Sequence, residues 1–273
     1  MALFNENGDA INEKRNVLDE IAQKTIVRIN EKKSKLPLDK IKEIAENLSI
    51  DTSFPFEKAL KCHDMAFICE VKKASPSKGL IAPDFPYVEI AKDYENAGAS
   101  AISCLTEPFY FQGDDEYLRE IVANVKIPVL RKDFTVDEYM IYEAKILGAS
   151  AVLLICAILD DNQLESYFKI AESLGLSCVV EAHTEEEVLR AVKIGARIIG
   201  VNNRNLKNFH VDLNHSINLR TLVSNDVIFV SESGIKTQQD IQTLRLNNVN
   251  AVLIGETLMR ADNKKEILDD LKG

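Results

Sequence analysis

The chain has 273 residues, of which 46% are hydrophobic and 28% are charged. This length and composition provide enough apolar surface for a large folded core and exclude both a disulfide-stabilised mini-protein and a disordered chain. The 43 acidic residues outnumber the 33 basic residues and give a net charge of −10. This balance argues against a nucleic-acid partner, because affinity for the phosphate backbone comes from clustered Lys and Arg. An anionic ligand would have to be held by local groups.

The first ten residues, MALFNENGDA, contain no basic region followed by an apolar run, so we expect no secretory signal. No apolar run approaches the ~20 residues that a membrane-spanning helix needs, so we expect no membrane partner. The five cysteines are odd in number and scattered, which favours free thiols and a cytoplasmic location. The four histidines have no metal-ligand spacing, and we expect no bound metal.

Residues 9–60 are rich in charge and have helical periodicity. Apolar residues recur at helical spacing at Ile11, Leu18 and Ile21, and again at Ile41, Ile44 and Leu48. A break is expected at Leu36-Pro37, because proline disfavours a helical conformation of the residue before it. We predict that residues 1–60 form a helical extension packed on a barrel domain, residues 61–273.

After residue 60, short β-branched runs alternate with segments of helical periodicity. The eight runs are Ala66–Val71, Ala101–Leu105, Pro128–Arg131, Ala151–Ile155, Cys178–Val180, Ile198–Val201, Val227–Val230 and Ala251–Ile254. The alternation indicates βα units, and eight of them predict an α/β fold of the (β/α)8 TIM-barrel type. A doubly wound open sheet is the alternative, but it usually has about five or six strands, and the sequence lacks the dinucleotide fingerprint G-x-G-x-x-G.

Polar residues follow most of these runs, and the carboxyl ends of barrel strands build the active site. The polar segments are 70–79, Arg131-Lys132-Asp133-Phe134, Glu181, Asn202-Asn203-Arg204, Ser231-Glu232-Ser233-Gly234 and Gly255-Glu256-Thr257. Because side chains alternate along a strand, Glu70 and Lys72 are expected on the same side. Lysines are concentrated between Lys72 and Lys78, and this local positive charge suits an anionic substrate.

Several of these segments resemble the motifs of indole-3-glycerol phosphate synthases. The matching motifs are Glu70-Val71-Lys72-Lys73-Ala74-Ser75-Pro76-Ser77, Leu105-Thr106-Glu107, Phe111-Gln112-Gly113, Leu130-Arg131-Lys132-Asp133-Phe134, Val180-Glu181, Gly200-Val201-Asn202-Asn203-Arg204-Asn205-Leu206 and Ser231-Glu232-Ser233-Gly234-Ile235. They occur in the family's order, and the helical extension is similar too. The resemblance implies a carboxy-lyase of tryptophan biosynthesis that cyclises and decarboxylates 1-(2-carboxyphenylamino)-1-deoxyribulose 5-phosphate to indole-3-glycerol phosphate, releasing CO2 and water.

The resemblance also implies catalytic roles for the strand-end residues. Lys132 would protonate the ketone oxygen during ring closure and stabilise the developing charge. Glu181 matches the carboxylate that handles the proton of the dehydration step, and Lys72 matches a second catalytic cation. How the acid and base roles divide among these three residues stays open. Three further residues resemble groups that orient the lysines and the substrate: Glu70, Glu232 and Asn202.

A phosphate group is best held by backbone N–H donors and a helix N-terminus. The resemblance assigns five residues to the substrate phosphate: Ser75, Ser233, Gly234, Gly255 and Glu256. At Glu256 the family often has a small residue, so a contact is expected from its backbone N–H.

An apolar wall is expected to face the aromatic ring of the substrate. Phe111 and Phe134 match the family's lining positions, and Leu154 is a further candidate. Arg204 is expected to contact either the substrate or neighbouring carboxylates.

Two alternatives remain at this stage. Another phosphate-binding barrel, similar to phosphoribosylanthranilate isomerase, would share the glycines after the last two strands but lack the extension and the set of Lys72, Lys132 and Glu181. A non-catalytic barrel that binds a phosphorylated ligand would be expected to lose one of the lysines. For the synthase we expect no cofactor, a small phosphorylated substrate as the partner, and a monomer or weak homo-oligomer.

Overall fold

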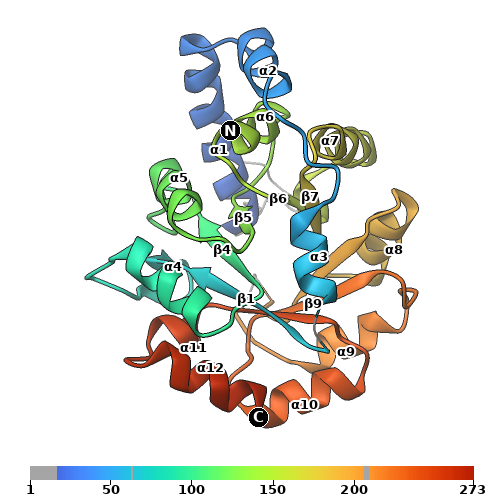
Figure 1. The fold of residues 1–273 in the computed structure, drawn as a ribbon. Helices are drawn as coiled ribbons and strands as arrows, with labels where there is room; N and C mark the ends of the chain where they lie inside the picture. The colour runs from blue at the N-terminus through green and yellow to red at the C-terminus, as the bar shows by residue number, and fades with distance from the viewer. Residues whose placement is uncertain (1–16, 63, 206–208) are drawn as a thin grey trace, which may run out of the picture.

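Eight parallel strands close into a barrel that is surrounded by helices (Figure 1). The computed structural model describes residues 17–62, 64–205 and 209–273. Each barrel strand pairs with the barrel strands that precede and follow it in the sequence, and the last strand pairs with the first to close the ring. The predicted (β/α)8 barrel is therefore confirmed. The barrel strands are β1 (Ala66–Val71), β4 (Ala101–Leu105), β5 (Val129–Lys132), β6 (Ala151–Ile155), β7 (Ser177–Ala182), β8 (Ile198–Asn202), β9 (Ile228–Glu232) and β10 (Ala251–Ile254).

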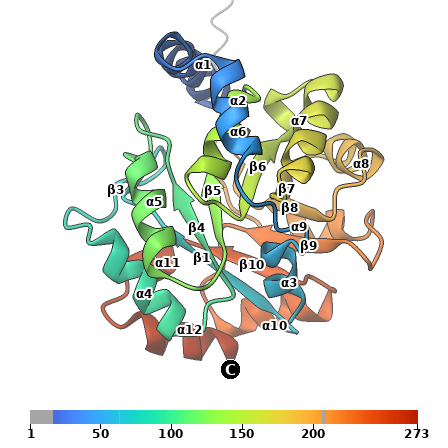
Figure 2. The same cartoon turned by 45° about the horizontal axis from the view of Figure 1, so that its top comes forward.

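Helices follow each barrel strand along the chain and form the outer layer of the barrel in both views (Figure 1, Figure 2). They are α4 (Tyr87–Asn96), α5 (Asp115–Asn124), α6 (Tyr139–Ile146), the short 3-10 helix η1 (Cys156–Ile158), α7 (Asp161–Ser173), α8 (Glu185–Lys193), α9 (Asn214–Arg220), α10 (Gln238–Leu246), α11 (Glu256–Met259) and α12 (Lys264–Lys272). Within the described part of the chain, no helix has the length and apolar character needed to cross a membrane.

Four barrel strands have the predicted bounds, and the other four extend further toward their carboxyl ends than their apolar runs. The extended strands β5, β7, β8 and β9 include Lys132, Glu181, Asn202 and Glu232. The parallel ladder explains the difference, since Leu105 pairs with Lys132 and Asn202 pairs with Glu232. A polar side chain that faces the barrel mouth leaves the backbone hydrogen bonds of its strand intact.

Two apolar layers follow from the alternation of side chains along the strands. Leu153 and Ile155 belong to the layer that fills the barrel interior. Val152 and Leu154 belong to the layer between the strands and the outer helices. The interior is therefore a packed core, and space for a ligand is left only where the strands end.

Three helices precede β1, as the predicted extension requires: α1 (Val17–Lys35), α2 (Leu38–Glu46) and α3 (Pro55–Lys61). The predicted break at Leu36-Pro37 is confirmed by the gap between α1 and α2. α1 buries Leu18 and Ile21. The predicted helical residue Ile11 lies outside the described residues, together with all of 1–16 and Leu206 of the strand-end motif.

Only part of the apolar periodicity between residues 41 and 48 is buried. The helix α2 packs on α6 and buries Ile41 and Ala45. Ile44 and Leu48, which share the helical spacing, are 44% and 41% exposed. α2 ends at Glu46, which leaves Leu48 outside the helix, and the small side chain of Ala45 allows close packing on α6.

α3 closes the end of the barrel where the strands begin. Its Phe56 and Leu60 are buried in the interior layer together with Ala66, the first residue of β1. Glu57 of α3 forms an ion pair of 2.7 Å with Arg197, which directly precedes β8. The opposite end, where the strands finish, stays open to the pocket described below.

A short antiparallel hairpin follows β1 in the lysine-rich segment 72–80. Its strands are β2 (Ala74–Ser75) and β3 (Gly79–Leu80). The backbone N–H of Ala74 donates a hydrogen bond of 3.2 Å to the carbonyl of Phe111. The hairpin is thus attached to the loop after β4 beside the barrel mouth.

Two glycines that follow outer helices provide a matched test of packing between the extension and the barrel. Gly175 and Gly195 have φ values of +73° and +78°, but a Cβ atom would lie 2.7 Å from the carbonyl oxygen of Asp51 only at Gly175. Gly195→Ala is expected to cost about 1 kcal/mol of unfolding free energy through the left-handed backbone alone. Gly175→Ala should cost at least ~1 kcal/mol more, measured by urea denaturation. Equal costs would contradict close packing against residue 51.

Candidate active site

A cavity of about 730 Å³ opens where the barrel strands end. Its lining includes residues from the strand ends, the β2–β3 hairpin and α1. Fourteen of the fifteen residues predicted for the site line this one cavity: Glu70, Lys72, Ser75, Phe111, Lys132, Phe134, Glu181, Asn202, Arg204, Glu232, Ser233, Gly234, Gly255 and Glu256. The geometry therefore brings together side chains that are up to 186 positions apart in sequence, from Glu70 to Glu256.

Lys132 lies at the centre of the pocket between two buried carboxylates. Its Nζ donates hydrogen bonds of 2.9 Å to Glu181 Oε2 and 2.6 Å to Glu232 Oε2. Burial alone would lower the pKa of Lys132, but the charges of the two carboxylates raise the pKa above its ordinary value. The ammonium form of Lys132 is therefore the resident state.

The two carboxylates beside Lys132 differ in their affinity for protons. Burial raises the pKa of Glu232 to about 7, with Lys132 opposing and Glu181 adding to the rise. Burial also acts to raise the pKa of Glu181, but the charge of Lys132 outweighs it, and the pKa lies below its ordinary value. Oε1 of Glu232 has no hydrogen-bond partner among the described residues. The pair thus separates a carboxylate that stays ionised from one that titrates near neutrality.

The raised pKa of Glu232 predicts a pH-dependent stability. The folded value of about 7 lies above the ordinary value of 4.5, so the stability that this carboxyl contributes at low pH is lost as the pH rises through about 7. Glu232→Gln removes this titration. The unfolding free energy of the variant relative to the wild type should therefore rise by more than ~1 kcal/mol between pH 5 and pH 8. A pH-independent difference in urea denaturation would contradict the raised pKa.

Glu70 and Lys72 form a second charged pair in the pocket. Lys72 Nζ donates to Glu70 Oε2, and both side chains are largely buried. Gly255 lies directly against this pair, because a Cβ atom at residue 255 would overlap Glu70 Oε2 and lie 2.7 Å from Lys72 Nζ. The absence of a side chain at Gly255 thus makes room for the ion pair, which the sequence did not indicate.

Residues at the end of β8 support the loop after β9. Asn202 Oδ1 accepts a hydrogen bond of 3.0 Å from the Arg204 backbone N–H. The buried Asn203, which the sequence analysis gave no role, donates from Nδ2 to Ser231 Oγ at 2.9 Å and to the Ser233 carbonyl at 3.1 Å. Asn203 therefore fixes the loop that contains Ser233. The sequence alone does not distinguish the role of Asn203 from that of Asn202, because the difference lies in their contacts in the folded structure.

The rim of the pocket carries several charged groups around Glu256. Its carboxylate lies 3.3 Å from Lys78 Nζ, 3.3 Å from Arg260 Nε and 4.0 Å from Arg204 Nη2. Burial acts to raise the pKa of Glu256, but Lys78 and Arg260 lower the pKa below its ordinary value. Ser233 and Gly234 line the same pocket. Their φ values of 68° and 88° give the turn after β9 a left-handed backbone that faces the cavity.

The apolar wall of the pocket comes from two sources. The rings of Phe111 and Phe134 have centroids 6.2 Å apart. Leu18 and Ile21 of α1 and Leu153 of β6 also line the cavity. The prediction of Leu154 as a lining residue is wrong, because Leu154 faces the outer helices and its neighbour Leu153 faces inward.

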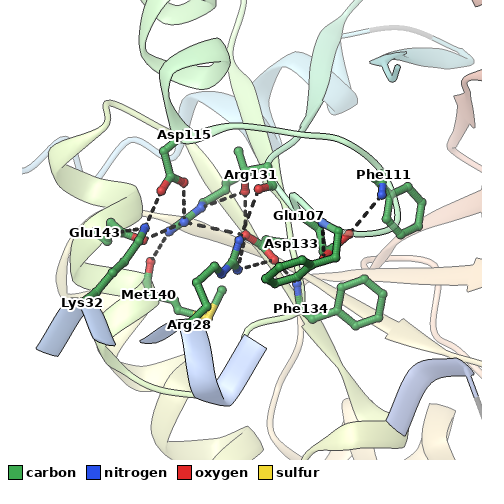
Figure 3. A network of polar contacts seen from close by, with 12 residues as sticks. Arg28, Lys32, Glu107, Phe111, Asp115, Arg131, Asp133, Phe134, Met140 and Glu143 are labelled. Carbon is green, nitrogen blue, oxygen red and sulfur yellow. Dashed lines mark hydrogen bonds and ion pairs between the residues drawn. The ribbon is translucent and has the colours of Figure 1, made fainter. Parts of the chain in front are cut away.

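A buried ionic network holds the strand that carries Lys132 (Figure 3). Arg131 is 2% exposed and donates hydrogen bonds of 2.6 Å to Asp115 Oδ1 and 2.7 Å to Glu143 Oε2. Arg28 of α1 donates bonds of 2.9 and 2.8 Å to the carboxylate of Asp133. Lys132 is thus flanked in sequence by two residues whose side chains are fixed, and α1 is fixed to the same strand end.

Phe111 is positioned by a buried carboxylate. Glu107 accepts hydrogen bonds from the backbone N–H groups of Phe109, Tyr110 and Phe111 at 2.9, 2.7 and 3.0 Å. These bonds form a tight turn that directs the ring of Phe111 toward Phe134 (Figure 3).

The carboxylates of this pocket are paired with lysines. Among the residues that the structure describes, no group of three or more His, Cys, Asp or Glu is arranged to hold a metal ion.

Solved structures of low sequence identity share the architecture. Thiamine phosphate pyrophosphorylase from Pyrococcus furiosus has a TM-score of 0.59 at 16% identity and matches 79% of this chain and 95% of its own. 3-Hexulose-6-phosphate synthase has a TM-score of 0.60 at 17% identity and matches 76% of this chain and 98% of its own. These similarities are evidence for the fold alone. Together with the pocket, they define the class as a TIM barrel with a site of paired lysines and carboxylates.

Sequence similarity defines the family within this class. The family profile described as Indole-3-glycerol phosphate synthase matches residues 18–271. Indole-3-glycerol phosphate synthase of Ruminiclostridium cellulolyticum is 56% identical over 257 residues, which cover 94% of this chain and 99% of the relative. The enzyme of Endomicrobium trichonymphae is 54% identical over 256 residues, with coverage of 94% and 99%. The chain belongs to the indole-3-glycerol phosphate synthase family.

Family membership confirms the activity that the motifs predicted. The chain is a carboxy-lyase of tryptophan biosynthesis with indole-3-glycerol phosphate synthase activity on a phosphorylated substrate. The alternatives of an isomerase-like barrel and of a non-catalytic barrel are set aside.

Proposed function

We propose that Lys132 is the general acid of ring closure. The aromatic carbon that bears the carboxylate attacks the ketone carbon, and the ketone oxygen needs a proton as its charge develops. The observation that carries the proposal is the Lys132 ammonium held at 2.9 and 2.6 Å between Glu181 and Glu232 in the cavity. A fixed ammonium in a site that excludes water stabilises the developing oxyanion before it transfers its proton.

The dehydration step needs a base for a carbon-bound proton and an acid for the departing hydroxyl. Glu181, whose pKa lies below its ordinary value, acts as the base in this proposal. Lys72 lies near the substrate carboxylate and acts as the acid. Glu70 orients Lys72 through their ion pair. Two other residues orient Lys132 and the substrate hydroxyls: Glu232 and Asn202.

The phosphate is proposed to bind at the rim. The turn after β9 and the start of the segment after β10 offer backbone N–H groups, and the cationic side chains around Glu256 add positive charge. The contacts are assigned to Ser75, Ser233, Gly234, Gly255 and the backbone of Glu256. The aromatic ring of the substrate then lies against Phe111 and Phe134, and Arg204 lies between the phosphate and Glu256.

The first test is an assay of the purified chain. Formation of indole-3-glycerol phosphate is followed by its fluorescence in the presence of EDTA, because the proposal uses no metal and no organic cofactor. Turnover that is unchanged by EDTA is expected. Loss of turnover on chelation, restored by a divalent metal, would contradict the proposal that the lysines supply the electrophilic assistance.

The phosphate site is tested by two variants of equal size. Gly234 has a left-handed backbone that Asp and Asn both tolerate better than most residues. Gly234→Asp places a negative charge beside the phosphate, whereas Gly234→Asn does not. We expect Asp to raise the KM at least ~10-fold more than Asn, since like charges in a partly buried site repel by more than ~1.4 kcal/mol. The same KM for both variants would place the phosphate elsewhere.

We also propose the organisation and surroundings of the enzyme. Residues 1–60 would be an extension packed on a single catalytic domain, residues 61–273. The ion pair of Glu57 with Arg197 and the bond of Arg28 to Asp133 support such packing. The free cysteines, four of them buried, are compatible with a cytoplasmic location. The net charge of −10 supports an enzyme without a nucleic-acid or membrane partner, acting as a monomer or weak homo-oligomer.

A further inference from the structure

His183 lies immediately beyond β7, two residues after Glu181, with its ring between two carboxylates. Its Nε2 is 3.6 Å from Glu181 Oε1, and its Nδ1 is 3.8 Å from Glu187 Oε2. Both ring nitrogens are buried, and neither has a hydrogen-bond partner among the described residues. Buried polar atoms without partners are costly and uncommon, so this arrangement calls for an explanation outside packing.

The backbone around His183 is fixed on both sides. Its N–H donates a hydrogen bond of 2.6 Å to Glu187 Oε2, and its carbonyl interacts with His215 Nε2 at 2.8 Å. The ring therefore stays between the two carboxylates although it makes no short hydrogen bond itself. Contacts of this length tighten in many enzymes only when the substrate is bound.

The two oxygens of Glu181 face different partners. Oε2 accepts a hydrogen bond from Lys132 in the pocket, and Oε1 faces His183. His183 does not line the cavity, whereas Glu181 does. The imidazole thus reaches Glu181 from the side away from the substrate. Glu187, on the other side of the ring, has a side chain that is 16% exposed.

The reaction itself has a proton requirement that this arrangement can meet. Ring closure forms a C–C bond, and the ketone oxygen takes up one proton. Loss of CO2 breaks the C–COO⁻ bond and returns its electron pair to the ring. Dehydration then adds one proton to the departing hydroxyl and removes one from the neighbouring CH2 carbon. With an ionised substrate carboxylate, each turnover therefore takes up one net proton: the two donors each regain a proton, and the base Glu181 must release the proton that it took from the CH2 carbon.

We propose that His183 is a positioning residue that acts through Glu181. Its ring takes the proton that Glu181 has removed from the substrate and passes this proton to solvent by way of Glu187. The inference rests on the proposed role of Glu181 as the base. The Glu181 side chain is only 4% exposed and faces the pocket, so a path on its far side lets it regain its working state while substrate or product fills the mouth. An imidazole suits this task because it has two ring nitrogens, so it can accept a proton at one and release a proton from the other.

The test compares three variants in steady-state turnover. His183→Ala should lower kcat at least ~10-fold with a KM within about twofold of the wild type, since His183 does not line the substrate cavity. Added imidazole should restore the kcat of His183→Ala, because it can occupy the vacated space. His183→Asn, which fills that space, should be as slow but insensitive to imidazole. Glu187→Gln, which keeps an acceptor for the His183 backbone N–H, should lower kcat in the same direction.

Three results would overturn the proposal. A kcat of His183→Ala within about twofold of the wild type would mean that no proton passes through the ring. A slow His183→Ala that imidazole does not restore, with a changed KM or a lowered Tm, would assign His183 a purely structural role. Near-normal kcat in Glu181→Gln would remove Glu181 as the base. That last result contradicts the proposed function itself and is measured independently of His183.

Discussion

Lys132→Met is expected to lower kcat by at least about 10²-fold, because it removes both the proton donor of ring closure and the fixed positive charge at the ketone oxygen. Methionine retains much of the apolar stem of lysine, so the packing of the barrel interior is largely kept. Without the ammonium, the pKa values of Glu181 and Glu232 should also rise, since its charge acts to lower both. Indole fluorescence at saturating substrate measures the effect on kcat.

A matched control for this variant is available outside the pocket. Lys33 on α1 forms an ion pair of 2.6 Å with Asp137 and does not line the cavity. Lys33→Met should leave kcat within about twofold of the wild type, because the side chain of Lys33 does not line the cavity in which the reaction takes place. If Lys132→Met retained near-normal kcat, Lys132 would lose its role as the acid, and Lys72 would become the candidate for both proton donations.

Arg131→Met is expected to lower the free energy of unfolding by about 3–5 kcal/mol. The guanidinium is 2% exposed, and its removal leaves the carboxylates of Asp115 and Glu143 with only the less buried Lys32 as their shared cation. Burial acts to raise the pKa of Asp115, and the charges of Arg131 and Lys32 hold it at about 2. In the variant the pKa of Asp115 should therefore rise, and the protein should unfold at a higher pH during acid titration.

The control for Arg131 is an arginine with an exposed partner. Arg119 donates a hydrogen bond of 2.7 Å to Glu116. The two side chains are 58% and 50% exposed. Arg119→Met should change the unfolding free energy by less than ~1 kcal/mol. Urea denaturation of both variants at one pH gives the comparison. Similar small losses in the two variants would mean that the network around Arg131 is no stronger than a surface pair.

The barrel could be predicted from the sequence because its signals are local. Each interior strand is buried on both faces and therefore appears as a continuous apolar run, as in Ala151–Ile155. The alternation rule placed Glu70 and Lys72 on one side, and both line the cavity. Strand ends were less predictable. Lys132 and Glu232 are polar, but they remain in the ladder because each pairs with a residue of a neighbouring strand, Lys132 with Leu105 and Glu232 with Asn202.

Other features of the site depend on contacts between distant segments and have no local signal. The choice between Leu153 and Leu154 requires the phase of β6, which an unbroken apolar run does not reveal. The periodicity of α1 indicated that Leu18 and Ile21 are apolar-face residues, but not that this face lies over the pocket. Similarly, nothing near Asp133 in sequence predicts Arg28 as its partner, because the two residues are 105 positions apart.

The position of α1 has a consequence for how the enzyme can change. The groups proposed to move protons lie on strand ends. Leu18 and Ile21, in contrast, form part of the apolar wall of the cavity and belong to a helix that precedes the barrel. The polar residues that fasten this helix, such as Arg28, lie further along it. Part of the apolar wall of the cavity is thus encoded apart from the strand ends, while Phe111, Phe134 and Leu153 belong to the barrel itself. Substitutions in α1 can reshape that part of the wall and leave the strand ends unchanged.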